Sequence, residues 1–149
     1  MIKGFKLLGL RYSPGYGDMR GALHEVSLRR DRDGNWTLTC RDREHHGAPV
    51  TVTVYAVDPE AAARFEEYLA GSSFPSLAKR PESDLFATDY SPWSWGIDYE
   101  RRSLCGIRRE YCGFDEYKKY SRRDHDAIRE LQERLTALRG NKISETAEE

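Results

Sequence analysis

Hydrophobic and polar residues alternate along several stretches of this chain, and a period of two is typical of half-buried β-strands. In the clearest stretch, residues 93–99, one side carries Trp93, Trp95, Ile97 and Tyr99 and the other carries Ser94, Gly96 and Asp98. Five more stretches alternate in a similar way: residues 2–12, 22–30, 36–40, 50–56 and 104–112. The pattern predicts six strands, the first four in an antiparallel meander. Residues 93–99 are expected to be the strand around which the rest of the fold packs.

The period changes to that of an amphipathic helix in two places. Asp58 and Pro59 form a typical helix start, and this helix is expected to run to about residue 70 and end at Gly71. The second helix is expected to begin at Ser121, which has capping-box spacing to Asp124, and to end at Gly140. The buried stripes would be Ala62, Phe65 and Leu69 in the first helix, and Ile128, Leu131, Leu135 and Leu138 in the second.

Two amphipathic helices need one apolar surface, and a twisted antiparallel sheet supplies it. The sequence therefore predicts an α+β fold in the order strand-strand-strand-strand-helix-strand-strand-helix. A single antiparallel sheet of about six strands would carry both helices on one face. Residues 1–140 are expected to form one domain, and residues 141–149 a disordered acidic tail.

Composition and charge narrow the function only slightly. The 149 residues are 38% hydrophobic and 33% charged with a net charge of −1, so the chain as a whole attracts neither nucleic acid nor an anionic membrane. No apolar run is long enough to span a bilayer. The three cysteines, Cys40, Cys105 and Cys112, are too few for a disulfide framework and indicate a reducing compartment. We expect a cytoplasmic protein, with an envelope location as the alternative if a leader has been removed.

Residues 83–93 have the pattern S-D-x-F-x-x-D-Y-S-P-W and are followed by the alternating strand. This stretch resembles a family of small bacterial α+β domains of unknown function, some of which are attached to lipoprotein leaders. The Gly-Tyr-x-x-Met at 15–19 and the helix after the fourth strand are also similar to that family. The family has no known activity, so the resemblance implies no catalytic residues.

No residue pattern points strongly to catalysis or to a metal. A metal site would have to draw on Cys40, His45, His46, Cys105 and Cys112, but these lack the close ligand pairs of zinc sites, and neighbouring histidines on a strand point to opposite faces. Asp84, Asp89 or Asp98 beside the tryptophans would suit a general acid, although Asp89 also fits a turn. We predict no catalytic residue, no metal and no cofactor.

Residues 101–123 combine basic and aromatic side chains. Eight cations stand against three acids in this segment, with tyrosines and a phenylalanine between them. Cations neutralise phosphates and aromatic rings stack on bases, so the segment is compatible with single-stranded nucleic acid. The residues expected to bind are Arg101, Arg102, Arg108, Arg109, Tyr111, Tyr117, Lys118 and Lys119. The alternative is a solvated edge strand whose aromatic side chains pack inward.

The preferred prediction is a non-catalytic protein-interaction or ligand-binding module, with another protein as the partner. A sheet that carries helices on one face leaves its other face free for recognition. Thr37, Thr39, Thr51, Thr53 and Tyr55 are expected to line that face. Single-stranded nucleic-acid binding through residues 101–123 is the second prediction, and an enzyme is less favoured.

Overall fold

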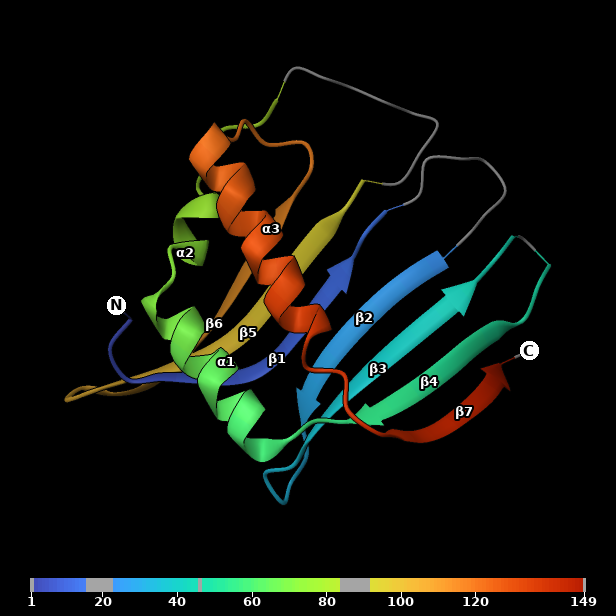
Figure 1. Ribbon diagram of the computed structural model, residues 1–149. Coiled ribbons are helices and arrows are strands. Elements are labelled where there is room, and N and C mark those ends of the chain that lie inside the picture. Colours follow the sequence, from blue (N-terminus) through green and yellow to red (C-terminus); the bar gives the residue numbers. More distant parts are fainter. Residues whose placement is uncertain (1, 16–22, 46, 84–91, 149) are drawn as a thin grey trace.

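The computed structural model describes residues 2–15, 23–45, 47–83 and 92–148 (Figure 1). These residues form one antiparallel sheet of seven strands, in the order β6-β5-β1-β2-β3-β4-β7. The strands are β1 (Phe5–Ser13), β2 (Leu23–Arg30), β3 (Trp36–Arg43), β4 (Val50–Ala56), β5 (Ser94–Ser103), β6 (Gly106–Asp115) and β7 (Lys142–Glu148). The helices are α1 (Pro59–Gly71), α2 (Phe74–Leu77) and α3 (Arg122–Thr136). The predicted α+β class with a single antiparallel sheet is confirmed.

The prediction of about six strands is wrong, because residues 142–148 form a strand where the sequence indicates a disordered tail. β7 pairs with β4 from Val50 opposite Glu148 to Tyr55 opposite Lys142. Every residue of β7 is exposed, so its sequence carries no alternation of apolar and polar side chains. An ion pair from Arg41 to Glu148, with an Nη2–Oε2 distance of 2.7 Å, adds to the backbone pairing. Backbone hydrogen bonds along the sheet edge therefore hold a segment that the hydrophobic pattern could not reveal.

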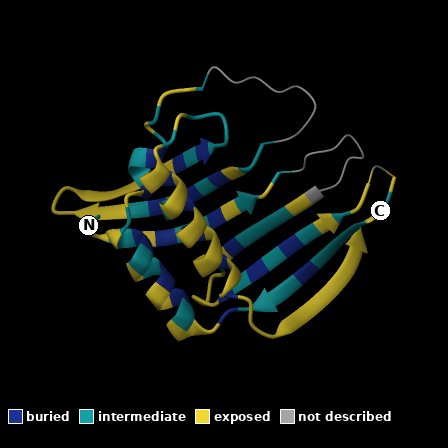
Figure 2. Ribbon diagram, turned by 45° about the horizontal axis from the view of Figure 1, so that its top comes forward, coloured by how far each residue is buried: buried dark blue, intermediate teal, exposed yellow. Residues whose placement is uncertain are grey.

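All three helices lie on one face of the sheet (Figures 1 and 2). The core between the layers takes Trp95, Ile97 and Tyr99 from β5, each at most 4% exposed. The predicted helix stripes are buried against it, from Ala62, Phe65 and Leu69 in α1 to Ile128, Leu131 and Leu135 in α3. No helix among the described residues is long and apolar enough to cross a membrane.

The turn between β5 and β6 lies further along the chain than the sequence indicates. The alternating stretch ends at residue 99, but β5 continues as far as Ser103. The turn is Leu104 and Cys105, because Ser103 pairs with Gly106. Charged side chains lie on both faces of this hairpin. Because an exposed ribbon has no buried face, its sequence lacks the alternation of apolar and polar residues that would identify the strands.

α3 begins as its sequence predicts. The Ser121 hydroxyl accepts a hydrogen bond from the Asp124 N–H at 3.1 Å, and the Asp124 carboxylate accepts one from the Ser121 N–H at 3.1 Å. Asp124 also accepts two hydrogen bonds from the Arg80 guanidinium, at 2.9 and 3.0 Å. Asp58 stands at the N-cap of α1 as expected, although its side chain accepts no capping hydrogen bond. Asp124 thus joins the start of α3 to the connection that follows α2.

We expect Asp124→Asn to lower the free energy of unfolding at neutral pH by about 1–2 kcal/mol, because it weakens a cap and a charge-assisted pair. The Arg80 guanidinium, followed by the Ser121 hydrogen bonds, holds the pKa of Asp124 below its usual value. When the pKa of a carboxyl group is lower in the folded protein than in the unfolded chain, its ionised form stabilises the fold. This contribution is complete above the unfolded-chain pKa of about 3.9 and is lost as the pH falls through the lower pKa of the folded protein. Urea unfolding at a series of pH values should show the two proteins converging below about pH 4.

The control for this prediction is Asp126→Asn on the same helix. Asp126 is 63% exposed and its contact with Arg129 is 3.8 Å, so little change is expected. A stability difference between wild type and Asp124→Asn that persists unchanged at acidic pH would contradict the assignment.

Candidate binding face

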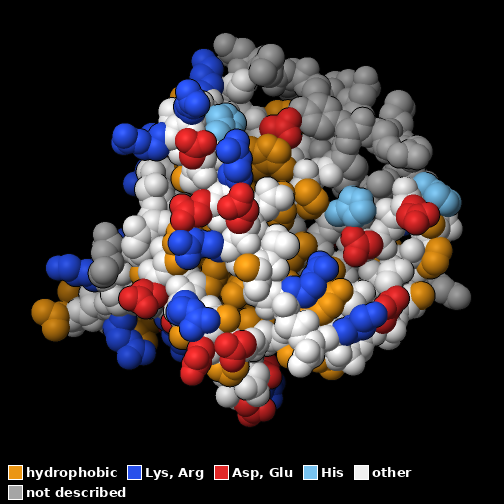
Figure 3. All heavy atoms as spheres, in the orientation of Figure 1, with side chains coloured by type: hydrophobic (Ala, Val, Ile, Leu, Met, Phe, Trp, Pro, Cys, Tyr) orange, Lys and Arg blue, Asp and Glu red, His pale blue; other side chains and the backbone are white. Residues whose placement is uncertain are grey.

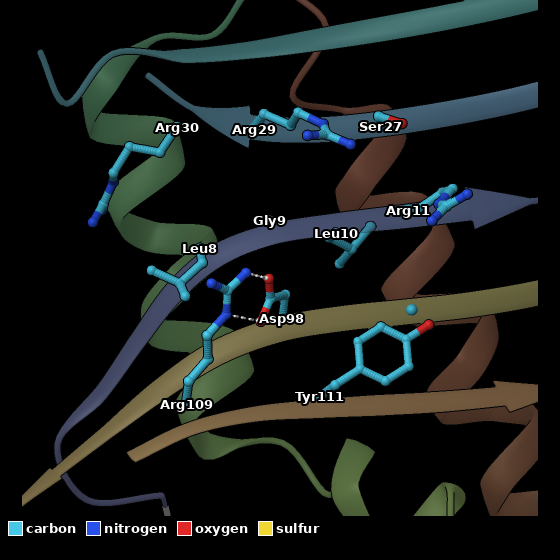
Figure 4. A pocket seen from close by; sticks show the side chains of 11 residues that line it. Leu8, Gly9, Leu10, Arg11, Ser27, Arg29, Arg30, Asp98, Arg109 and Tyr111 are labelled. Carbon is cyan, nitrogen blue, oxygen red and sulfur yellow. Dashed lines mark hydrogen bonds and ion pairs between the residues drawn. The ribbon is translucent and has the colours of Figure 1, made fainter. Parts of the chain in front are cut away.

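The face of the sheet opposite the helices is uncovered by any described element, and it is the candidate site. Figure 4 views this face with the helices behind the sheet. Because side chains alternate along a strand, the inward placement of Trp95 and Ile97 turns Gly96 and Asp98 outward. On β6, the burial of Cys112 and Phe114 likewise turns Tyr111 and Gly113 to the open face.

Tyr111 is a large aromatic side chain on this face, and it is 70% exposed. Its ring covers Gly96 and Gly113, which are directly paired across β5 and β6. A Cβ atom at Gly96 would collide with the Tyr111 hydroxyl, and one at Gly113 would lie 3.1 Å from the ring atom Cε1. The two glycines therefore make the flat seat on which the ring rests.

A hollow of about 260 Å³ opens beside the Tyr111 ring (Figure 4). Its walls come from four neighbouring strands: β6, β5, β1 and β2. A second, shallower hollow of about 510 Å³ lies on the same face toward Asp115 and shares Arg11, Gly96 and Tyr111 with the first. Tyr111 thus stands at the junction of two depressions in the open face.

Four arginines line the first hollow, but Arg30 turns its guanidinium toward Glu66 of α1, 3.5 Å away. The other three come from different strands. Arg109 donates two hydrogen bonds to Asp98, at 3.1 and 2.5 Å, and this pairing raises the pKa of its guanidinium. Arg11 lies 3.6 Å from the Glu25 carboxylate. Arg29 is exposed and forms no side-chain hydrogen bond or ion pair within the described part of the chain. The hollow therefore contains an aromatic ring, one cation without an acidic partner in the described part of the chain, and two cations already held by acids.

The structure separates the eight residues that the sequence groups as a binding segment. Arg109 and Tyr111 lie together on the open face, whereas Arg101, Arg102 and Arg108 lie at the far end of the β5–β6 hairpin. Tyr117, Lys118 and Lys119 follow β6 on the way to α3. Lys118 donates to the Arg80 carbonyl at 3.3 Å and to Glu82 at 3.2 Å, so its charge is partly neutralised.

Arg11 and Arg29 belong to the candidate site, and sequence reasoning missed them. Each stands next to a core leucine, Leu10 and Leu28 respectively, which places the arginine on the opposite face of its strand. Alternation could therefore have assigned them to the open face. It could not have shown that β1 and β2 lie beside β5 and β6.

The open face near β4 differs from the prediction. Thr37 and Thr39 do lie on it, but Thr51, Thr53 and Tyr55 point to the helix side, because Thr53 is paired with buried Cys40 and Tyr55 with buried Leu38. Thr53 is 7% exposed, and the Arg139 guanidinium lies 4.6 Å from the Tyr55 ring centre. The valines of β4 face outward instead. The alternation in β4 is real, but hydrophobicity does not identify its inner face, because near the sheet edge a polar residue such as Thr53 can be the covered one.

The other residues considered for chemistry do not converge in the described part of the chain. Cys40 on β3 and Cys112 on β6 are four strand spacings apart, about 19 Å, and Cys105 is exposed in a turn. No group of three described His, Cys, Asp or Glu residues is placed to hold a metal ion. Asp98 points away from the tryptophans, so its suggested place in an aromatic pocket is wrong. Asp84, Asp89 and His46 lie outside the described residues.

Comparison of the chain with protein-family models, curated proteins and solved structures gives no significant match. Most of the 83–93 stretch that suggested a family resemblance lies outside the described residues, and so does most of 15–19. The resemblance therefore stays a prediction, and the open face of the sheet is the feature that indicates a function.

Proposed function

We propose that the protein is a non-catalytic binding module whose partner lies on the open face of the sheet, across β6, β5, β1 and β2. The observation that carries this proposal is the exposed Tyr111 ring seated on Gly96 and Gly113 beside a hollow. Tyrosine and arginine are the side chains most often found at the energetic centre of protein interfaces. Here one tyrosine and arginines from three strands meet on a rigid sheet, so little conformational entropy is lost on binding.

The charges of the hollow indicate the chemistry of the partner. Arg109 and Arg11 are held by acids, whereas Arg29 has no acidic partner among the described residues and can pair with an incoming carboxylate. The Tyr111 ring offers its face to an apolar or aromatic side chain. An acidic peptide segment that also carries one such side chain satisfies both groups, and it needs no chemistry from the protein.

We expect Tyr111→Ala to weaken binding of an acidic peptide by a factor of roughly ten or more, as for central interface tyrosines. The probe is a displayed library of random peptides selected on the wild-type protein, followed by titration of the selected peptides. Tyr111→Phe should retain most of the affinity, because it keeps the ring. Arg29→Gln should lower the affinity, while Arg64→Gln on α1, an arginine 70% exposed on the other face, should not.

A second variant changes the glycine beneath the Tyr111 ring rather than the ring itself. Gly96→Ala keeps Tyr111 but places a methyl group where its hydroxyl lies, so the ring must move while the fold remains. Affinity should fall, with little change in the urea midpoint. Selected peptides that bind Tyr111→Ala, Arg29→Gln and Gly96→Ala as tightly as wild type, or a library that yields no binder, would overturn the proposal.

Single-stranded nucleic acid is the second candidate partner. An aromatic ring on an open antiparallel sheet, beside the exposed Arg29, is also a suitable platform for stacking a base. Fluorescence anisotropy of a labelled single-stranded oligonucleotide, titrated with the protein, distinguishes the two candidate partners. Binding that depends on Tyr111 and weakens steeply with added salt would favour nucleic acid, and no binding at low salt would remove it.

A further inference from the structure

The β5–β6 hairpin extends beyond the rest of the fold (Figure 1). β1 accompanies β5 only as far as Phe5 opposite Arg101, and a hydrogen bond from the Arg102 N–H to the Gly4 carbonyl at 2.9 Å closes this contact. All nine residues from 101 to 109 are exposed. The end of the hairpin is therefore a free two-stranded ribbon whose contacts contribute little to the core.

Apolar side chains stand at the end of this ribbon. Leu104 in the turn is 108% exposed and Ile107 is 59% exposed, and Figure 3 shows hydrophobic side chains at this extremity. Turns in soluble proteins are normally made by small and polar residues, and leucine has no conformational advantage in a two-residue turn. The fold gains nothing from Leu104, so a role outside the fold is the simpler explanation.

Cations surround the ribbon just behind its apolar end. Lys3, Arg101, Arg102 and Arg108 line a hollow of about 570 Å³. Arg101 and Arg108 are directly opposite each other, and like charges in that arrangement destabilise a hairpin. Arg101 lies 3.8 Å from Glu110, but the side chains of Lys3, Arg102 and Arg108 have no acidic partner among the described residues. The hairpin thus carries positive charge that opposes its own folding.

The cations lie on both faces of the ribbon. Arg101 and Arg108 share one face, while Arg102 shares the other with Ile107, its cross-strand partner. A nucleic-acid groove or a peptide would contact one face of a ribbon laid against it. If the ribbon enters a layer of lipid headgroups end-on, the headgroups contact both of its faces, and its apolar end reaches the acyl chains.

We propose that the hairpin end inserts into the surface of an anionic lipid bilayer, with Leu104 and Ile107 in the apolar boundary and Lys3, Arg101, Arg102 and Arg108 among the headgroups. Apolar burial and attraction to anionic lipids act together in such peripheral binding. None of these six residues lines the hollow beside Tyr111, so this proposal does not depend on the proposed function.

Cys105 provides a direct probe of insertion, because it is the exposed cysteine in the turn while Cys40 and Cys112 are buried. An environment-sensitive fluorophore attached to Cys105 should shift to the blue with vesicles of equal parts phosphatidylcholine and phosphatidylglycerol. It should not shift with phosphatidylcholine alone, and added salt should weaken the effect. Unlabelled protein should co-sediment with the same vesicles, which excludes an effect of the fluorophore.

Leu104→Ser should lower partitioning into the mixed vesicles roughly tenfold or more, because one buried leucine side chain is lost. The matched control is Ile143→Ser on β7, since Ile143 is 60% exposed but lies on the opposite edge of the sheet. Arg102→Gln combined with Arg108→Gln should lower binding to anionic vesicles, and Arg129→Gln on α3 should not. Tyr111→Ala should bind vesicles as wild type does, so failure of one proposal is distinguishable from failure of the other.

Three results would overturn the proposal. They are no binding to the mixed vesicles at low salt, equal binding to phosphatidylcholine alone, and unchanged binding by Leu104→Ser. Binding of a duplex oligonucleotide that requires Arg102 and Arg108, without vesicle binding, would also overturn it and would assign the hairpin to nucleic acid.

Discussion

Replacing Trp95 with alanine is expected to lower the free energy of unfolding by about 3–5 kcal/mol. The indole is 3% exposed and stacks on Tyr12 and Phe114, with ring centres 4.2 and 6.3 Å away. β5 is hydrogen-bonded on both sides, to β1 and β6, so the backbone cannot collapse into the space left by the ring. Domains of this size are stable by only about 5–15 kcal/mol, and urea unfolding followed by circular dichroism should measure the loss.

Trp93→Ala is the matched control for Trp95→Ala. Trp93 is half-buried and lies just before the start of β5, where its ring stacks on Tyr120 at 5.7 Å. Its loss should cost clearly less, because solvent already reaches the site. Trp95→Phe should also cost less than Trp95→Ala, since it keeps an aromatic ring and removes an indole N–H that has no described hydrogen-bond partner. Equal losses for Trp93→Ala and Trp95→Ala would contradict the central role of Trp95.

Replacing Gly4 with alanine is expected to cost about 2–5 kcal/mol, from two separate causes. Gly4 has a φ of 65°, a left-handed conformation that costs other residues about 1–2 kcal/mol. In addition, a Cβ atom at Gly4 would overlap the backbone carbonyl of Arg102, which is held in β5. The overlap can be relieved only if the start of β1 separates from β5. Such overpacking lowers the free energy of unfolding by about 1–3 kcal/mol more.

Gly34→Ala separates these two causes. Gly34 has a φ of 85° but nothing within 4 Å of its Cβ position, so only the conformational cost of about 1–2 kcal/mol applies. Urea unfolding of both variants should therefore give a larger loss for Gly4→Ala. Hydrogen exchange at the Arg102 amide should accelerate in Gly4→Ala alone. Equal losses, with Arg102 exchange unchanged, would show that the added methyl group is accommodated without separating β1 from β5.

The elements predicted most accurately are those with strong local patterns. β5 has its alternation and α3 has both its capping box and its leucine stripe, and these are properties of residues close in sequence. β7 has no such pattern. Its position follows instead from Gly140, whose N–H donates to the Ala56 carbonyl at 3.1 Å and directs the chain along the edge of β4. An exposed edge strand is specified by its neighbour, which lies some ninety residues earlier in the chain.

The candidate site was predictable only in part, and the reason is again long-range pairing. Arg109 and Tyr111 were identified, because basic and aromatic residues are interleaved in their segment. Arg101, Arg102 and Arg108 were grouped with them by closeness in sequence, but the length of the hairpin separates them in space. Arg11 and Arg29 were missed, because only the sheet order places β1 beside β5 and β2 beside β1.

The sequence by itself determined the fold class, the inward side of β5 and the start of α3, since each depends on the spacing of neighbouring residues. The tertiary structure alone decided that β5 lies between β1 and β6, that β7 closes the other edge, and that the valines of β4 face outward. Those features depend on which strands pair and which face the helices cover. Strand pairing and the choice of the covered face depend on the apolar surface buried by the whole chain. They therefore cannot be predicted from any single stretch of sequence.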